Sequence, residues 1–380
     1  MRYSRAMPTL NENAAIAKKA LWPFLVLALA LCSPFALTAQ SPAKKPPLPV
    51  LAGTDALGRV FLWQEGVKLF VTDPWETNVL VGGELVSADK SQSWHLRGYT
   101  VEEPLIRFWN LTLELGKPAK PEELAPVKRR TFLRDDFGVE RPDFGAKQGD
   151  TLALLYGSAS PLPRWELWKN GLKVQAKTWD DGRIYTSVAV NPAGQALWAG
   201  RSSEGAAFVE SPSDTFLSPV PGRVSALSWN PLSDPPGWVA VGWGALVGQP
   251  PAFLVWQGEQ WLVAATKGPP LANSAGVLSQ KLAFTAKGEL LAAGIVADKG
   301  GLHYPWIWEP SGGRVLELPF NPTLHAFSAS GDAGWFLVVQ DADGAWSLVS
   351  EAASSRLEGL DETDKVVFAA SVDSGAPATQ

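Results

Sequence analysis

The chain has 380 residues, 46% of them hydrophobic, and a formal net charge of −5 at pH 7. This composition is that of a globular protein, and an acidic balance without a basic stripe argues against a nucleic-acid-binding protein. Once an N-terminal segment is removed, about 340 residues remain, which suits two ordinary domains or one closed ring of repeats.

Residues 1–43 are predicted to be a signal peptide. Lys18 and Lys19 form its positive region, and residues 20–31 form an apolar run of signal-peptide length. The alternative is an N-terminal membrane anchor. Pro23 and the short apolar run argue against that alternative, because a bilayer-spanning helix needs about 20 apolar residues.

The end of this segment defines the expected mature protein. Small residues place the cleavage site after Ala39 or Ala43, and Met7 is an alternative start to Met1. The mature chain is therefore expected to be exported, as a periplasmic, cell-surface or secreted protein. No transmembrane segment is expected after cleavage.

Cys32 is the only cysteine of the chain. Residues 29–32 resemble a bacterial lipobox, but Leu31 stands where a small residue belongs, so we favour cleavage beyond Cys32 and leave lipoprotein processing as the alternative. The mature chain then has neither a disulfide nor a cysteine metal site. Residues 44–50 follow as a tether rich in lysine and proline, expected to be extended.

The clearest local pattern of the mature chain lies in residues 187–200. Two apolar runs flank a turn in which Asn191 and Gly194 both tolerate positive φ, and the second run ends on Gly200. This pattern predicts a β-hairpin. A polar loop and a third apolar run, residues 206–209, follow.

The same order of runs recurs along the mature sequence. Positions that correspond to Gly200, which we call anchors, are 53, 98, 157, 200, 242, 294 and 340, with glutamine in place of glycine at the last. The spacings lie near the length of a four-stranded propeller blade, which is about 40–50 residues. We therefore predict an all-β fold, a seven-bladed β-propeller formed by residues 51–380.

The two ends of the repeat region predict how the ring closes. Almost no mature sequence precedes Gly53, whereas residues 366–372 form an apolar strand after the last unit. A blade shared between N-terminal and C-terminal strands would remove two exposed edges. We expect this shared blade, and a monomer.

The longest interruption of the repeats is residues 117–150, predicted to be a charged insertion. It is either a lid or docking loop for a partner, or a solvated decoration. Residues 131–133 are expected to supply the first strand of the third unit. Asp135 and Asp143 lie in this interval, but the carboxylate spacing matches no calcium-loop motif.

Residues 189–209 resemble the HAF-type extracellular repeat, and the resemblance extends over residues 50–375 as a degenerate repeat. Residues 87–94 also resemble a loosened Asp-box of sialidase-type propellers, with serine in place of its glycine and threonine. An Asp-box is a structural turn, so this resemblance implies no sialidase activity.

The 18 tryptophans fall into two groups. Five occupy corresponding positions and are expected to pack between blades, because large aromatic rings fill the wedge between twisted sheets: Trp63, Trp109, Trp168, Trp256 and Trp308. Trp179 and Trp243 lie in predicted loops, where each either stacks on a ligand or packs locally.

No catalytic pattern is visible in the sequence. His95, His303 and His325 are the only histidines, and they show no metal-ligand spacing. Neither a nucleophile elbow nor a phosphate-binding glycine loop is present. We therefore expect no cofactor, no metal, and a non-enzymatic binding or scaffold module for a protein or glycan.

Two alternatives remain open at this stage. One is a carbohydrate-active enzyme, either a glycoside hydrolase or a lyase, with acidic side chains meeting at the mouth of the central channel. The other is a structural component without a small ligand.

The ligand site is expected on the face that carries the loops after the anchors. These loops are long in the fifth and sixth units, residues 243–251 and 295–305, and loop variation on a fixed scaffold commonly creates binding sites. The candidate residues form an aromatic platform ringed by polar groups: Trp243, Asp298, Lys299, His303, Tyr304, Arg59 and Arg201.

Overall fold

The structure is a computed structural model. It describes residues 48–72, 78–88, 91–102, 105–115, 127–138, 142, 144–157, 163–245, 251–264, 274–285, 287–310, 312–316, 318, 321–330, 334–351 and 353–372. Within these ranges all regular structure is β, and no helix there is long and apolar enough to span a bilayer. The predicted signal peptide lies outside the described residues.

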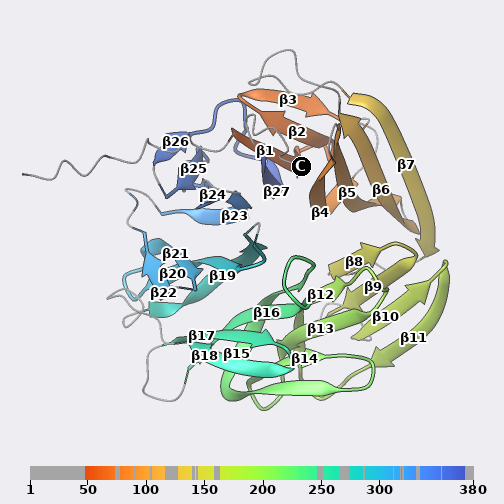
Figure 1. Cartoon of the computed structure of the whole chain (residues 1–380), viewed down its shortest axis with the longest axis vertical. Helices are drawn as coiled ribbons and strands as arrows, with labels where there is room; N and C mark the ends of the chain where they lie inside the picture. The colour runs from red at the N-terminus through yellow and green to blue at the C-terminus, as the bar shows by residue number, and fades with distance from the viewer. Residues whose placement is uncertain are drawn as a thin grey trace, which may run out of the picture. The chain divides into compact units, whose positions relative to one another are not determined.

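The strands form six antiparallel sheets within residues 46–380 (Figure 1). From the innermost strand outward, blade 1 comprises β27 (Lys365–Val372), β1 (Leu48–Thr54), β2 (Val60–Gln64) and β3 (Val67–Phe70). Blade 2 comprises β4 (Asn78–Ala88), β5 (Ser91–Glu102), β6 (Leu105–Leu115) and β7 (Val127–Gly138). Blade 3 comprises β8 (Phe144–Gln148), β9 (Thr151–Tyr156), β10 (Arg164–Lys169) and β11 (Leu172–Thr178).

Blades 4 and 5 share one seven-stranded sheet. Blade 4 comprises β12 (Ile184–Val190), β13 (Ala196–Arg201), β14 (Ala206–Glu210) and the first part of β15 (Thr215–Asn230). Blade 5 comprises the rest of β15, then β16 (Gly237–Gly244), β17 (Ala252–Gln257) and β18 (Gln260–Ala264). Blade 6 comprises β19 (Ser274–Phe284), β20 (Leu290–Asp298), β21 (His303–Glu309) and β22 (Gly312–Val315). Blade 7 comprises β23 (Thr323–Ser330), β24 (Gly334–Gln340), β25 (Trp346–Ser350) and β26 (Ser354–Arg356).

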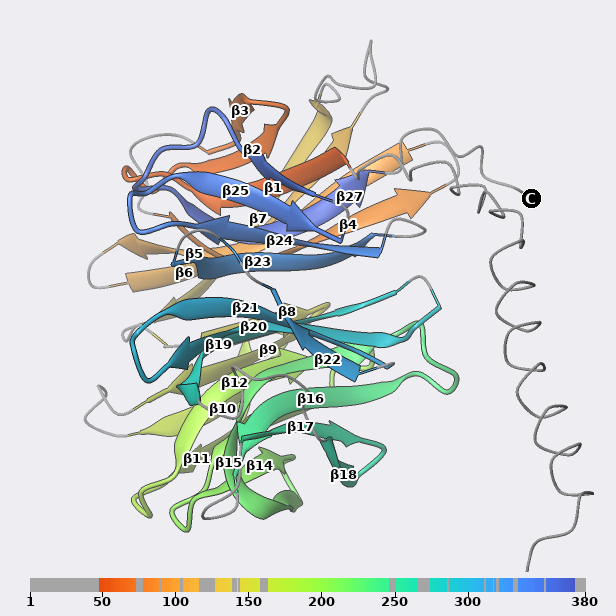
Figure 2. The same ribbon diagram turned by 90° about the vertical axis from the view of Figure 1, so that its left-hand side faces the viewer.

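The long strand β15 serves two blades in succession. Residues 215–221 pair with β14, and residues 222–230 pair with β16. If β15 is counted once for blade 4 and once for blade 5, the sheets divide into four-stranded blades. Their number is consistent with the predicted seven. Their innermost strands contact one another in the cyclic order β27, β4, β8, β12, β15, β19, β23 and back to β27. The chain is therefore a β-propeller; Figure 2 shows the blades from the side.

The predicted shared blade is confirmed. β27 pairs with β1 in antiparallel register from Leu48 opposite Val372 to Thr54 opposite Lys365, and the two strands lie side by side in Figure 1. Because β1 begins at Leu48, the last three residues of the predicted tether belong to the sheet. Strands from both ends of the repeat region therefore close the ring.

An ion-pair cluster reinforces this closure. Lys68 on β3 lies 2.6 Å from the buried carboxylate of Asp364 and 2.7 Å from that of Asp361, just before β27. Burial by itself would lower the pKa of Lys68, but its hydrogen bonds to the two carboxylates raise the pKa overall. The cluster links the outer edge of blade 1 to the segment that enters its innermost strand.

Hydrophobic packing is divided among wedges between neighbouring blades. Seven buried clusters occur among the described residues, and each joins one pair of adjacent blades. Trp63, Trp109 and Trp256 are buried in these clusters, and Trp168 and Trp308 pack against them. The prediction that these five tryptophans pack between blades is therefore confirmed.

The anchor glycines have a steric role. Gly53, Gly98, Gly200 and Gly242 lie within second strands, each opposite a β-bulge of the innermost strand. A Cβ atom at Gly242 would lie 2.1 Å from the carbonyl oxygen of Arg223. The prediction that Gly242 opens a loop is wrong, because β16 continues to Gly244. The bulge brings two backbones so close that only glycine fits.

The interval 117–150 contributes strands to the ring. It contains β7, the outermost strand of blade 2, and β8, the innermost strand of blade 3. Residues 131–133 therefore lie in β7, and the prediction that they begin the third unit is wrong. The physical reason is that β8 is short and contains small and polar residues, so it lacks the apolar pattern that residues 131–133 have.

His325 is the bulged residue of β23, opposite Val338 and Val339 of β24. Its ring lies 4.5 Å from that of Trp346, and its buried Nε2 has no hydrogen-bond partner within the described ranges. Burial, together with the charge of Lys281 on the neighbouring β19, lowers the pKa of His325 to about 4. His325 is therefore neutral in the folded protein near pH 7.

Replacing Gly242 by alanine is expected to destabilise the fold by about 2–3 kcal/mol, because the new methyl group collides with backbone atoms that cannot rotate away. Gly237→Ala is the matched control in the same strand, since its Cβ would meet no atom closer than 3.9 Å. Urea unfolding of both variants measures the difference. Equal midpoints for the two variants would show that the bulge tolerates a side chain.

Acidification is expected to destabilise the protein through His325. Its folded pKa lies below the unfolded value of about 6.5, so protons bind preferentially to the unfolded chain as the pH falls below that value. Between pH 7 and pH 5 the wild type should lose about 2 kcal/mol more than His325→Gln. Urea unfolding at both pH values measures this, with His303→Gln as the control. An identical pH dependence of the wild type and His325→Gln contradicts the assignment.

Candidate functional site

The loops of the ring emerge on two faces. One face, here called the BC face, carries the loops between the second and third strands, such as residues 55–59, 202–205 and 299–302. The other, the AB face, carries the loops between the first and second strands, such as residues 191–195 and 231–236. The predicted ligand residues belong to the BC side of the ring.

Three of the predicted residues stabilise their own loops. Arg59 forms an ion pair of 2.6 Å with Asp55, and its guanidinium lies 3.8 Å above the ring of Phe70. Asp298 accepts a hydrogen bond of 2.9 Å from the backbone N–H of Leu302 and one of 3.4 Å from the Tyr304 hydroxyl. These contacts give Arg59, Asp298 and Tyr304 local structural roles.

The remaining blade 6 candidates lie at the end of that hairpin. Lys299 is exposed in the β20–β21 turn, and His303 begins β21, where its backbone N–H donates to the side chain of Asn321. Neither residue lines the two cavities described below. Lys299 and His303 therefore share neither of these cavities with Arg59 or Arg201.

Trp243 is not a loop residue as predicted. It lies within β16, is only 7% exposed, and packs edge-on against Trp306 at a centroid distance of 4.7 Å. Its indole N–H has no hydrogen-bond partner among the residues that the structure describes. The predicted open platform of Trp243 and Tyr304 is therefore wrong, because the strand continues beyond the anchor and buries the indole between blades.

Arg201 and Trp243 do meet in one cavity, here called the blade 4–5 cleft, with a volume of about 320 Å³. Its lining residues are Arg201, Gly205, Pro221, Gly222, Arg223, Trp243, Gly244, Ala245 and Pro251. The backbone N–H of Gly222 donates to the carbonyl of Gly205 over 2.8 Å, which fixes the blade 4 loop against β15. Glycine and proline form most of the walls, so the backbone itself shapes the cleft.

The charge of the cleft comes from two arginines without partners. Within the described part of the chain, the side chains of Arg201 and Arg223 form no hydrogen bond or ion pair, and both are exposed. By contrast, Arg164, Arg183 and Arg314 each pair with carboxylates. Two guanidinium groups that no described carboxylate neutralises, beside a wall of glycine and proline, suit an anionic ligand.

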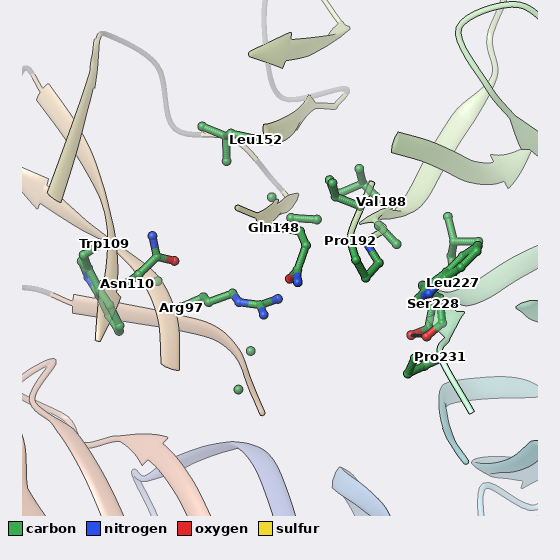
Figure 3. Close-up of a pocket in the computed structure, with 18 residues that line it drawn as sticks. Arg97, Trp109, Asn110, Gln148, Leu152, Val188, Pro192, Leu227, Ser228 and Pro231 are labelled. Carbon is green, nitrogen blue, oxygen red and sulfur yellow. Dashed lines mark hydrogen bonds between the residues drawn. The ribbon is translucent and has the colours of Figure 1, made fainter. Parts of the chain in front are cut away.

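A second and larger cavity, here called the blade 2–3 recess, has a volume of about 480 Å³. It lies among the inner strands of blades 2 to 5 and reaches between blades 2 and 3 (Figure 3). Its polar side chains are Arg97, Asn110, Gln148 and Ser228. None of these four residues was predicted. The small residues Gly82-Gly83 and Gly145-Ala146 on the inner strands are the sequence feature that could have indicated a cavity wall with few side chains.

Among the described residues, neither set of lining residues contains aspartate or glutamate. The buried Glu210 instead joins blades 3 and 4, accepting hydrogen bonds from Lys177 and Arg183, each 2.7 Å long, and from Tyr185 over 3.0 Å. Within the described ranges, no group of three or more histidine, cysteine, aspartate or glutamate side chains is arranged to hold a metal ion.

No model of a known protein family matches this sequence, and no curated protein matches it. Solved structures resemble it at low identity. Apo AztD from Citrobacter koseri is 11% identical with a TM-score of 0.42, covering 81% of this chain and 82% of that one. YCF48 bound to D1 peptide is 12% identical with a TM-score of 0.40, covering 83% and 89%.

The WD40 domain of Pan2 from Neurospora crassa is 9% identical with a TM-score of 0.35, covering 72% of this chain and 77% of that domain. Similarity at this level says nothing about function. The propeller fold itself is established by the strand order and the ring of contacts.

Proposed function

We propose that this chain is an exported, non-enzymatic β-propeller that binds an anionic group of a protein or glycan in the blade 4–5 cleft. The observation that carries the proposal is the pair of unpartnered arginines, Arg201 and Arg223, at a cleft that also contains Trp243. Charge-assisted hydrogen bonds from arginine to carboxylate or sulfate groups are strong and geometrically specific.

The position of the cleft supports the proposal. It lies on the BC side, where loops differ from blade to blade while the strands remain regular. Arg201 follows the anchor of blade 4, and Arg223 is paired with Trp243 of blade 5. A ligand here would touch two blades, because Arg201 belongs to blade 4 and Arg223 to the part of β15 in blade 5.

The proposed non-enzymatic role is supported by the chemistry of the cavities. Glycoside hydrolysis uses two carboxylates on opposite sides of the scissile bond. The lining of the cleft instead offers cationic donors and apolar surface. Such a lining can hold an anion but has no group to act as general acid or base at neutral pH.

The resemblance to HAF-type repeats is part of the same proposal. Residues 189–209, which carry it, run from the end of β12 through β13 to β14. They include the anchor Gly200 and the cleft residues Arg201 and Gly205. If these residues form an extracellular repeat, the cleft would be accessible to ligands of the cell envelope and to secreted ligands.

The cleft is tested with Arg201→Gln/Arg223→Gln. We expect the wild type to bind oligogalacturonate, as the acidic glycan probe, or an acidic peptide. The double variant should bind that probe about 10- to 100-fold more weakly, a total loss of about 1.4–2.7 kcal/mol, since exposed charged contacts contribute less than the about 1.5–3 kcal/mol of a buried one. Isothermal titration calorimetry at two salt concentrations measures both affinities.

Arg356→Gln is the matched control, because Arg356 is an exposed arginine on β26, away from the cleft. It removes one of the two positive charges that the double variant removes, and should bind within twofold of the wild type. If the double variant and the wild type bind the probe equally well, the cleft is not the binding site. If only neutral probes bind, the ligand is not anionic.

Export is tested by the mass of the protein recovered outside the cytoplasm. The positive region at Lys18 and Lys19 and the apolar run after it motivate the proposal. We expect an intact mass that begins near residue 40 or 44. A soluble cytoplasmic product that retains residues 1–30 would contradict export.

A further inference from the structure

Trp229 is the one tryptophan of the described residues that belongs to none of the seven clusters between blades. It lies near the end of β15, just before the AB loop of blade 5, and its side chain is half-buried. Its ring contacts that of Trp238 edge to face at a centroid distance of 5.2 Å. The other described tryptophans fill wedges between blades, so Trp229 is the exception to that structural role.

Trp229 instead lines the blade 2–3 recess, together with Pro192 and Pro231. These two prolines belong to the AB loops of blades 4 and 5, so this part of the recess lies on the AB side of the ring. The blade 4–5 cleft lies on the BC side. The recess volume of about 480 Å³ falls within the range of small-ligand pockets, about 300–1,000 Å³.

The AB loops of blades 4 and 5 are held in place by their own hydrogen bonds. The carboxamide of Asn191 donates to Oε1 of Gln195 over 2.7 Å, and the backbone N–H of Gln195 donates to Oδ1 of Asn191 over 2.9 Å. The carboxamide of Asn230 donates to the carbonyl of Gly288 over 2.8 Å, which ties the blade 5 loop to blade 6. A ligand that meets these loops therefore finds them already ordered.

Two carboxamides provide the polar side of the recess. Asn110 of β6 and Gln148 of β8 line it, both are half-buried, and neither side chain forms a hydrogen bond within the described ranges. Each offers one carbonyl acceptor and two N–H donors. In the view of Figure 3 the labelled side chains run from Asn110 through Gln148 and Pro192 to Ser228 and Pro231.

The charge of Arg97 is no part of the proposed site. Arg97 lines the recess, but it already interacts with another group of the chain. The other described side chains of the lining are uncharged. This favours a neutral ligand over an ionic one, because an ion that leaves water needs a partner of opposite charge.

A sugar ring matches an indole opposite carboxamides. One face of a pyranose ring presents C–H groups, which pack against the negatively polarised face of an indole. Its edge carries hydroxyl groups, and each hydroxyl both donates and accepts hydrogen bonds, as a carboxamide does. A prolyl peptide would match the apolar surface of Trp229 but has no N–H to offer to the carbonyl oxygens of Asn110 and Gln148.

We propose that the blade 2–3 recess binds a neutral sugar, with one ring stacked on Trp229 and its hydroxyl groups hydrogen-bonded to Gln148 and Asn110. This site goes beyond the proposed function. It differs from the blade 4–5 cleft in the face of the ring on which it lies and in the charge of its ligand, and it does not depend on the cleft.

The test titrates the full chain with cellobiose and N,N′-diacetylchitobiose, and with sorbitol and N-acetyl-tetraproline amide as comparison probes. Calorimetry should show binding of at least one disaccharide. Sorbitol should bind at least about tenfold more weakly, because it carries hydroxyl groups without a rigid apolar face. The indole N–H resonance of Trp229 in a nitrogen-correlated NMR spectrum, identified by its loss in Trp229→Phe, should shift on titration with the disaccharide.

Trp229→Ala is the decisive variant. It should weaken disaccharide binding at least about tenfold and keep the fold, because Trp229 belongs to no cluster. Trp179→Ala is the matched control: Trp179 is also half-buried, but it packs against Tyr185 at a centroid distance of 4.3 Å and lines neither cavity. It should bind the disaccharide as the wild type does. Gln148→Leu should weaken binding about fivefold through the lost hydrogen bond.

Three results would overturn the proposal: no binding of either disaccharide, equal affinity for sorbitol and the disaccharides, or full affinity in Trp229→Ala. Tighter binding of the prolyl peptide would also overturn it and would identify a peptide site. If Trp229→Ala does not fold, full affinity in Gln148→Leu together with an unshifted Trp229 resonance overturns it. Arg201→Gln/Arg223→Gln should bind the disaccharide as the wild type does, so failure at the cleft and failure at the recess are distinguishable.

Discussion

Pairing between β27 and β1 closes a ring in which every blade depends on both neighbours. Each sheet has two apolar faces, and among the described residues each wedge between adjacent blades contains its own buried cluster. If the two terminal strands separated, β1 would expose an unpaired edge, and the contacts of β27 with β23 and β4 would be lost. The Lys68 ion pairs with Asp361 and Asp364 act at this same junction.

Close approach between the first two strands of one blade explains the anchors. The β-bulges of the inner strands press against glycine in the second strands, so the repeated glycine reflects a steric limit. Cavities occur where side chains do not fill the space between blades. Gly82 leaves one such space beside β4, where a Cβ atom would meet no atom within 4 Å.

Charged side chains in this molecule differ in whether described residues of opposite charge pair with them. Glu210 and Glu166 are buried and neutralised by nearby lysine and arginine side chains, so their role is to join strands and blades. Arg201 and Arg223 sit at a cleft without such partners. Cations that the fold does not neutralise are available to a ligand, and for this reason the proposed function rests on them.

The sequence by itself determined the all-β fold, the repeat length, the shared terminal blade and the packing of the five corresponding tryptophans, because alternating apolar runs and turn residues report local strand structure. It did not reveal that β16 continues past Gly242 and buries Trp243, or that residues 131–133 belong to β7. Only the tertiary structure decided which residues meet. It joined Arg201 to Arg223 and Arg97 to Gln148, residues far apart in sequence, because inter-blade contacts depend on the angles between sheets and have no period along the chain.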